Sequence, residues 1–130
     1  MRILIAEDDY ASRQFLFKLL SQYGDCDIVV DGMEAVEAFM MSIRKKQLYD
    51  LVCLDIMMPK ADGKQVLKAI REMEKQNDIL PQDASKVVMI SALNETDIVF
   101  ETFDTGSEAY AAKPLNTEKF IKLLEKLELI

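Results

Sequence analysis

The 130-residue sequence has no histidine and only two cysteines. Cys26 and Cys53 do not form a CxxC pair, and no imidazole is available to join them. This pattern argues against a zinc site and against a disulfide framework. Free cysteine is usually buried and behaves as a small hydrophobic residue, so we expect both cysteines in the core.

Long apolar runs are also missing. The N-terminal run, residues 3–6, is followed at once by Glu7, Asp8 and Asp9, and it is too short for a signal peptide or a membrane-spanning helix. The sequence has no internal repeat, low-complexity tract or Gly/Ser-rich linker, so we expect residues 1–130 to form one domain. We predict a cytoplasmic protein that does not contact the membrane.

Basic residues are the minority among the charged ones. The chain has 16 lysines and arginines against 23 acidic residues, which gives a net charge of −7. A surface of this sign repels the phosphate backbone that supplies most nucleic-acid affinity, so direct DNA binding is not expected. Half of the residues are hydrophobic and 30% are charged, which is typical of a globular domain.

The apolar residues form short runs that predict strands. Residues 2–6, 51–54 and 86–91 are mostly apolar and lack polar alternation, as in parallel strands buried on both faces. Residues 26–30 and 109–112 are predicted as the second and fifth strands.

Helical patterns separate these strands, with apolar residues recurring at intervals of three and four. We predict that Asp9 caps the first helix, that Gly24 ends it, and that a further helix covers residues 96–105 and ends at Gly106. The predicted core stripes are Ala11, Phe15, Leu16, Leu19, Leu20 and Tyr23; Ala35, Val36, Phe39, Met40 and Ile43; Val66, Leu67, Ile70 and Met73; and Phe120, Ile121, Leu124 and Leu127.

Strands and helices therefore alternate as βαβαβαβαβα. This alternation predicts an α/β fold, a doubly wound five-stranded parallel sheet with helices on both faces. In the flavodoxin-like strand order 2-1-3-4-5, the first and third strands are neighbours, and ligands gather at the carboxyl ends of the strands.

This order would bring together three acids, because Glu7 and Asp8 follow the first strand and Asp55 follows the third. Carboxylates held at one rim raise one another's pKa and destabilise the fold unless a cation neutralises them. A hard divalent ion with oxygen ligands does so. We therefore predict a site for Mg²⁺ or Mn²⁺.

Two further polar residues are predicted at the same edge of the sheet. Ser91 ends the fourth strand and Lys113 follows the fifth. A cation and a hydroxyl beside a metal-bound carboxylate describe a phosphoryl-transfer site. We interpret Asp55 as the nucleophile, since a carboxylate can attack phosphorus and form an acyl phosphate.

Together, these motifs resemble the receiver domains of two-component response regulators, the CheY-like family. Five motifs occur in the family's order, each at a predicted strand end. They are Ile5-Ala6-Glu7-Asp8-Asp9, Leu54-Asp55-Ile56-Met57-Met58-Pro59, Ala61-Asp62-Gly63, Ile90-Ser91-Ala92 and Tyr110-Ala111-Ala112-Lys113-Pro114.

The resemblance implies a set of metal ligands. Asp8 is expected to bind Mg²⁺ directly, and Glu7 is expected to bind it through a water molecule. Asp55 is expected to be both the phosphoacceptor and the second ligand, and the backbone carbonyl of Met57 the third.

The resemblance also implies roles around the phosphoryl group. Ser91 is expected to bond it and Lys113 to form an ion pair with it, and the Lys113-Pro114 peptide bond is expected to be cis. Tyr110 matches the aromatic residue that moves with Ser91 on activation. Gly63 is expected to relieve backbone strain before the third helix.

The implied output is a change in the face formed by helix 4, strand 5 and helix 5, which would bind an unknown output protein. The chain has no histidine to carry phosphate itself, so the donor is expected to be a histidine kinase, a histidine phosphotransfer protein or a small donor such as acetyl phosphate. The chain ends 17 residues after Lys113, so we expect no effector domain. We expect a monomer or a weak homodimer, with part of an apolar set in helix 4 exposed: Ile98, Val99, Phe100 and Phe103.

The sequence departs from the family's common pattern in two places. Residues 76–86 lengthen the connection from Asp55 to Ser91, and we expect this loop at the end of the domain opposite the acids. Met57 and Leu93 are apolar where some relatives hold polar groups that orient the attacking water. We therefore hypothesise slow autodephosphorylation.

Three alternatives belong to other classes. A flavin-binding electron carrier shares the sheet order, but the run Glu7 to Asp9 would repel a phosphate after the first strand. A Mg²⁺-dependent phosphatase would carry nucleophile and acid two residues apart after that strand, where Asp8 and Tyr10 stand. A degenerate receiver that only binds partners is the third alternative.

Overall fold

The computed structural model describes residues 1–92 and 106–130. The predicted helix over residues 96–105, its apolar residues and Leu93 lie outside this part of the chain. In order, the described elements are β1 (Arg2–Ala6), α1 (Tyr10–Leu20), β2 (Asp25–Val29), α2 (Gly32–Arg44), β3 (Leu51–Asp55), α3 (Gly63–Gln76), the 3₁₀ helix η1 (Pro81–Asp83), β4 (Lys86–Ala92), β5 (Ala109–Lys113) and α5 (Thr117–Lys126).

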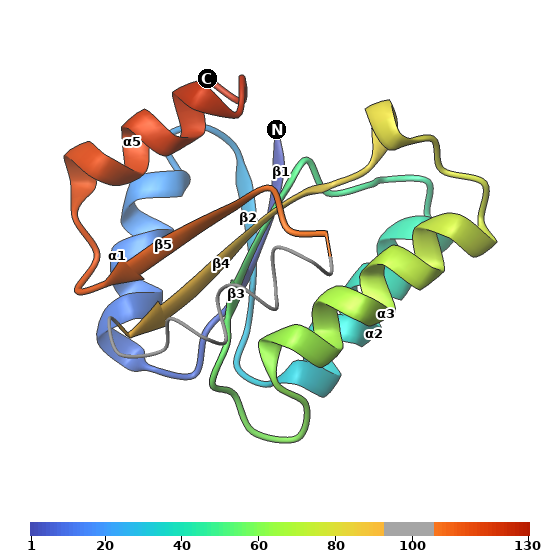
Figure 1. Ribbon diagram of the computed structural model, residues 1–130, viewed down its shortest axis with the longest axis horizontal. Coiled ribbons are helices and arrows are strands. Elements are labelled where there is room, and N and C mark those ends of the chain that lie inside the picture. The colour runs from blue at the N-terminus through green and yellow to red at the C-terminus, as the bar shows by residue number, and fades with distance from the viewer. Residues whose placement is uncertain (93–105) are drawn as a thin grey trace.

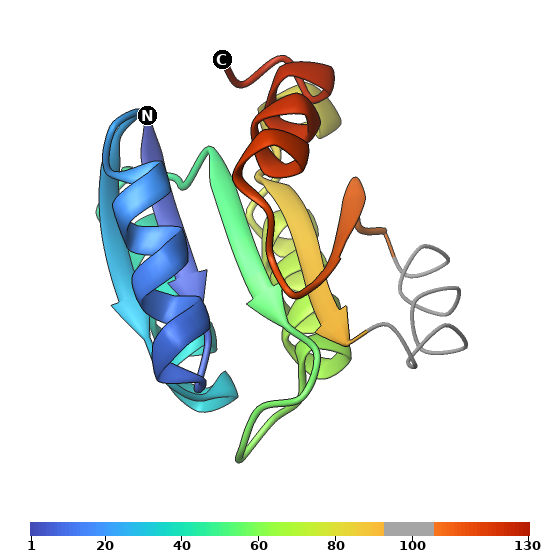
Figure 2. The same ribbon diagram turned by 90° about the vertical axis from the view of Figure 1, so that its left-hand side faces the viewer.

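The five strands form one parallel sheet in the order β2-β1-β3-β4-β5. Helices α1 and α5 cover one face of the sheet and α2 and α3 cover the other (Figures 1 and 2). The predicted doubly wound α/β fold and its strand order are confirmed. None of the described helices is long and apolar enough to cross a bilayer.

The core consists of two apolar clusters, one on each face of the sheet. Phe39 of α2 and Leu67 of α3 are fully buried in the first cluster. Leu16 of α1 and Phe120 of α5 are buried in the second. Each such side chain contributes roughly 1.5–3 kcal/mol through removal of apolar surface from water. Because β3 is covered on both faces, all five of its residues are buried.

Three local predictions were wrong. Helix α1 ends at Leu20 with Ser21 as its cap, and Gly24 is needed instead because the carbonyl of Met1 leaves no room for a Cβ there. Met40 is 38% exposed, because α2 turns its Phe39 side to the sheet. Ala11, predicted in the core stripe of the first helix, is exposed at the start of α1.

Arg71 of α3 connects three elements at the end of the sheet where β4 and β5 begin. Its guanidinium donates to Glu74 Oε1 at 2.6 Å, to the Ser85 carbonyl at 3.0 Å and to both carboxylate oxygens of Glu108 at 2.8 Å. It also donates to the carbonyl of Gly106. The loop between α3 and β4 is thereby fixed opposite the carboxyl ends of the strands, as predicted (Figure 1).

We predict that Arg71→Met lowers the free energy of unfolding by about 3 kcal/mol, because it leaves the carboxylates of Glu74 and Glu108 without their cation. Urea denaturation followed by circular dichroism would measure this loss.

Arg44→Met is the matched control, since Arg44 is exposed at the end of α2. We expect that change to cost less than about 0.5 kcal/mol. Equal losses in the two variants would show that the Arg71 contacts do not stabilise the fold.

Candidate functional site

Three acids meet where β1 and β3 end. Strands β1 and β3 are neighbours with Ala6 opposite Leu54, so the residues that follow β1 lie beside the last residue of β3. One oxygen from each of Glu7, Asp8 and Asp55 lies within 4.8 Å of the others. Glu7 is fully buried and Asp55 is 3% exposed, whereas Asp8 is exposed to solvent. The sheet order thus brings together the three acids named from the sequence.

Lys113, the last residue of β5, reaches two of these acids. Its Nζ lies 3.1 Å from Glu7 Oε1 and 3.4 Å from Asp55 Oδ2. Strand β4 separates β5 from β3, so the long lysine side chain spans the end of β4. The Lys113-Pro114 peptide bond is cis. Asp55 therefore has a cation beside one of its two oxygens.

Backbone groups hold the acidic side chains in place. The amide of Asp9 donates to Glu7 Oε1 at 3.0 Å, and the amide of Met57 donates to Asp55 Oδ1 at 3.3 Å. Arg13 donates to the carbonyls of Glu7 and Asp8 at 3.2 and 3.3 Å. Sequence reasoning missed Arg13. Its place in the first turn of α1 was the available signal, because helical side chains point back towards the helix N-terminus.

Gly63 allows the N-terminus of α3 to approach the end of β3. A Cβ at this position would lie 2.6 Å from the carbonyl oxygen of Asp55 and 2.8 Å from Cα of Ile56. The amide of Gly63 also donates to the Ile56 carbonyl at 2.8 Å. The positive φ in this connection belongs to Lys60. Glycine is therefore required by lack of space, and the expected relief of backbone strain was the wrong reason.

Two predicted site residues do not contact the acids in the part of the chain that is described. Ser91 is buried, and its hydroxyl donates to the carbonyl of Ala92 at 3.2 Å. Tyr110 is half-buried and packs against the apolar cluster under α2 and α3. The roles assigned to both residues by resemblance stay predictions.

Burial and neighbouring charges shift the pKa values of Asp55 and Lys113. Burial raises the pKa of Asp55 to about 8, and the negative charge of Glu7 acts in the same direction, while Lys113 offsets part of the rise. Burial by itself lowers the pKa of Lys113, but its hydrogen bond to Glu7 and the charge of Asp55 outweigh burial and raise it. Lys113 alone therefore does not neutralise the acids.

The donor set fits a hard divalent cation. Glu7 Oε2 is buried and has no hydrogen-bond partner within the described residues, a situation that costs about 1–3 kcal/mol. The ligand atoms offered by Glu7, Asp8 and Asp55 are all carboxylate oxygens, and they come from the ends of β1 and β3. A Mg²⁺ ion that keeps several waters would satisfy both the unpaired oxygen and the excess negative charge.

We predict that, without divalent cations, the free energy of unfolding falls as the pH rises from about 5 to about 9. The folded state favours protonated Asp55, so this contribution is fully present below the unfolded pKa of about 4 and is lost as the pH passes through the raised folded pKa. Magnesium at about 100 times its dissociation constant should restore about 2.7 kcal/mol at high pH. Urea denaturation in EDTA and in Mg²⁺ would measure both effects.

Asp55→Asn provides the control, since it removes the titrating group and one metal ligand while preserving shape. The variant should lose most of the pH dependence and most of the gain from Mg²⁺. If its pH profile matches that of the unchanged protein, Asp55 does not carry a raised pKa.

Comparison with known sequences identifies relatives along nearly the whole chain. The pattern of the family described as "Response regulator receiver domain" matches residues 3–125. The chain is 34% identical over 123 residues to the chemotaxis protein CheY of Treponema pallidum, which covers 93% of this chain and 78% of that protein. It is 30% identical to the transcriptional regulatory protein DltR of Streptococcus agalactiae, of which it spans about half the length (49%).

The fold has close counterparts among solved structures. The crystal structure of the CheX-CheY-BeF₃-Mg complex from Borrelia burgdorferi matches with a TM-score of 0.81 and 28% identity, covering 98% of this chain and 89% of that chain. The family pattern, the sequence relatives and the strand order agree. The chain therefore belongs to the response regulator receiver domain family, the CheY-like signalling modules of two-component systems.

Proposed function

We propose that this receiver domain accepts a phosphoryl group on Asp55 from a phosphohistidine donor, in a reaction that depends on Mg²⁺. The observation that carries the proposal is the contact of Lys113 with both Glu7 and Asp55 at a rim of three acids. An ion pair that served stability alone would not need two more carboxylates around it. The related CheY of Borrelia burgdorferi was solved with BeF₃ and Mg.

Asp55 is the nucleophile in this proposal. The Met57 amide donates to its Oδ1 and the Lys113 ammonium to its Oδ2, which sets the plane of the carboxylate. An oxygen of Asp55 attacks phosphorus, the phosphorus–nitrogen bond of the donor breaks, and the imidazole leaves with the electron pair. The product is an acyl phosphate on Asp55.

The surrounding groups balance the charge of the transferring phosphoryl group. Lys113 can turn from Asp55 to a phosphoryl oxygen without leaving Glu7, which holds its Nζ at 3.1 Å. Asp8, Asp55 and the carbonyl of Met57 would hold Mg²⁺ directly, with Glu7 acting through a water molecule. When bound, the ion supplies positive charge to the phosphoryl oxygens.

The output in this proposal is a shift of the face formed by the helix predicted over residues 96–105, by β5 and by α5, coupled to Ser91 and Tyr110. Receiver domains act between histidine kinases and output partners, and the sequence relatives include hybrid histidine kinases. For this chain the donor is a histidine kinase or a histidine phosphotransfer protein, and no nucleic acid is contacted directly.

The proposal predicts a mass increase of about 80 Da, one phosphoryl group, on incubation with acetyl phosphate and Mg²⁺. Intact-mass spectrometry at neutral pH would detect it. EDTA and the Asp55→Asn change should each abolish the increase, because the first removes the cation and the second removes the nucleophile. Lys113→Met should slow the reaction by at least about tenfold, since one cation at a developing charge contributes about 1.4 kcal/mol or more.

Lys60→Met is the matched control for Lys113→Met. Lys60 lies in the loop that follows Asp55, but its Nζ pairs with Asp31 at 3.4 Å instead of with Asp55. The phosphorylation rate of the Lys60→Met variant should stay within about twofold of that of the unchanged protein. If neither acetyl phosphate nor beryllofluoride reacts at Asp55 in Mg²⁺, the chain is a receiver that only binds partners.

Met57 generates a prediction about the lifetime of the acyl phosphate. Its side chain is 59% exposed beside Asp55 and has no polar group that could orient a water for hydrolysis. We expect Met57→Asn combined with Leu93→Glu to shorten the lifetime several-fold, measured as loss of the added mass after donor removal.

Met41→Asn is the control for a change of surface polarity. Met41 is 49% exposed on α2, away from β3. An unchanged lifetime in the double variant would refute the hypothesis of slow autodephosphorylation through apolar neighbours.

A further inference from the structure

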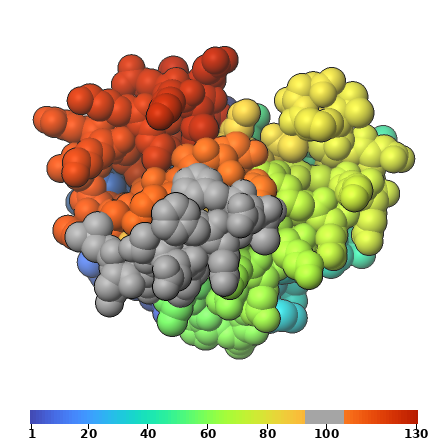
Figure 3. Space-filling view, in the orientation of Figure 1, coloured from blue at the N-terminus to red at the C-terminus, as the bar shows by residue number. Residues whose placement is uncertain are grey.

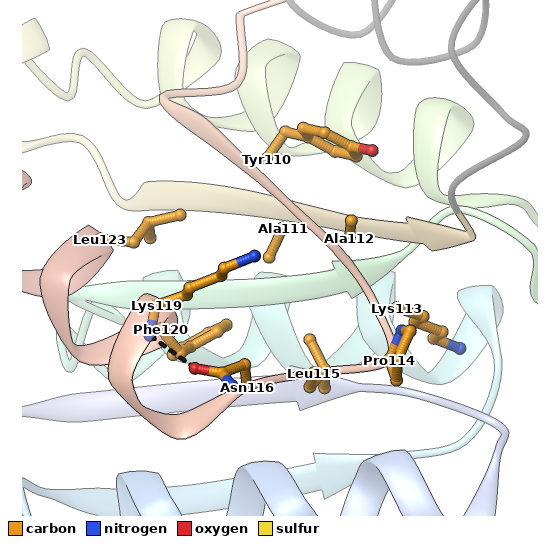
Figure 4. Close-up of a pocket in the computed structure, with 10 residues that line it drawn as sticks. All are labelled: Tyr110, Ala111, Ala112, Lys113, Pro114, Leu115, Asn116, Lys119, Phe120 and Leu123. Atoms are coloured by element: carbon orange, nitrogen blue, oxygen red, sulfur yellow. Dashed lines mark hydrogen bonds between the residues drawn. The ribbon is translucent and has the colours of Figure 1, made fainter.

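Lys113 and Arg13 both reach the ends of β1 and β3, but they come from different elements. Lys113 ends β5, whose alanines also line a groove against α5, formed by two adjoining hollows of about 370 and 600 Å³. The surface is hollowed there between the red atoms of α5 and the orange atoms of β5 (Figure 3). In Figure 4 the Lys113 ammonium points away from Lys119 and Leu123, which line the groove. Lys113 is therefore directed at the acids, where it contacts two carboxylates.

Arg13 contacts the acidic segment in a different way. It lies in the first turn of α1, and its Nη1 donates to the carbonyls of Glu7 and Asp8 at 3.2 and 3.3 Å. Within residues 1–92 and 106–130 it forms no ion pair with a carboxylate. The guanidinium therefore holds two consecutive peptide groups and leaves the carboxylate oxygens of both acids to other partners.

The peptide group between Asp8 and Asp9 is held at both ends. Its carbonyl accepts a hydrogen bond from Arg13, and its amide donates to Glu7 Oε1 at 3.0 Å. A donor on the carbonyl of a peptide group strengthens the amide at its other end, because hydrogen bonds in a chain polarise one another. Arg13 thus acts on the Glu7 carboxylate through the backbone. Without Arg13 this peptide group would be free to rotate, and Glu7 would lose one of the two contacts of its Oε1.

The stability of α1 does not explain the position of Arg13. The N-terminus of a helix carries a partial positive charge, so a cation in the first turn is unfavourable. That turn holds no acidic residue, and the capping carboxylate of Asp9 accepts from the Ser12 amide instead of from Arg13. The guanidinium lies over the ring of Tyr10, with its Cζ 5.5 Å from the ring centroid. This contact and the two hydrogen bonds hold it against the carbonyls despite the unfavourable charge.

We propose that Arg13 is a positioning residue for the divalent-cation site. It fixes the peptide groups that follow Glu7 and Asp8, so that one oxygen from each of these acids and from Asp55 lies within 4.8 Å of the others. Arg13 donates only to the backbone among the described residues, so it acts through the two acids. The proposal rests on the proposed function, since it takes the three acids as the Mg²⁺ site.

Arg13 has two opposite effects on a divalent ion. Its positive charge repels the ion, whereas its hydrogen bonds order the acids that bind it. The side chain is only half-buried, so solvent and salt screen the repulsion, and the ordering of the acids is the larger effect. Loss of the side chain should therefore weaken Mg²⁺ binding, although loss of the charge alone would strengthen it.

Isothermal titration calorimetry of the full chain with Mg²⁺, without a phosphoryl donor, tests this role. We expect Arg13→Met to raise the dissociation constant at least about tenfold. Arg13→Lys keeps the charge and still carries a donor for the carbonyls, so it should bind Mg²⁺ more tightly than Arg13→Met. Arg44→Met is the matched control, because it removes the same charge from an exposed position at the end of α2. Its dissociation constant should stay within about twofold of that of the unchanged protein.

Phosphorylation by acetyl phosphate gives a second readout. In Arg13→Met the Mg²⁺ concentration that gives half of the maximal rate should rise at least about tenfold, and by a larger factor than the maximal rate falls. Urea denaturation without Mg²⁺ would show whether each variant folds. Tyr10→Ala loosens the guanidinium without removing its charge, at a position that is 68% exposed. It should also weaken Mg²⁺ binding, whereas Tyr10→Phe, which keeps the ring, should not.

The positioning role is overturned if folded Arg13→Met binds Mg²⁺ as tightly as the unchanged protein or more tightly, or if it binds as tightly as Arg13→Lys. A maximal rate that falls by more than the Mg²⁺ dependence shifts would also overturn it. If Arg13→Met does not fold, equal binding by Tyr10→Ala and Tyr10→Phe has the same meaning. In each of these cases the unchanged protein binds Mg²⁺ and the proposed function stands. If the unchanged protein does not bind Mg²⁺, the proposed function fails, and the positioning role fails with it.

Discussion

The balance of charge at one rim of the sheet constrains the rest of the structure. Glu7 is fully buried, and within residues 1–92 and 106–130 only its Oε1 is hydrogen-bonded, to Lys113 and to the Asp9 amide. Such an arrangement is costly in a folded protein unless a cation is available. The supporting contacts, including those of Arg13 and of the Met57 amide, hold the acids close together despite this cost. A fold arranged for stability alone would keep these three carboxylates apart.

The two ends of the sheet have different roles. At the carboxyl ends, Glu7 and Asp55 are buried beside the exposed Asp8. At the opposite end, Arg71 joins α3 to the starts of β4 and β5 with hydrogen bonds that leave its partner carboxylates satisfied. These contacts form a fixed frame at the end of the sheet that lies away from the acids. The lengthened connection before β4 contributes to this frame without approaching the acids.

The edge strand β5 links the acid site to the α5 surface. Its last residue, Lys113, contacts the acids, and its alanines form the floor of the groove lined by Lys119 and Lys122. Strand β5 therefore contributes both to the acid site, through Lys113, and to the surface beside α5, through its alanines. Small side chains suit such a strand, because they allow a neighbour to approach the backbone closely.

Much of this protein follows from sequence alone. Apolar runs of strand length alternate with helical stripes, which determines a doubly wound sheet, and acids that end neighbouring parallel strands must meet at one edge. Local patterns could not decide what depends on three-dimensional neighbours. Met40 reads like a core residue but faces solvent, and Gly63 is needed for space that only the packing of α3 on β3 defines. The partners of Lys113, the clamp of Arg71 and the groove beside Ala111 join residues far apart in the chain, so only the tertiary structure decided them.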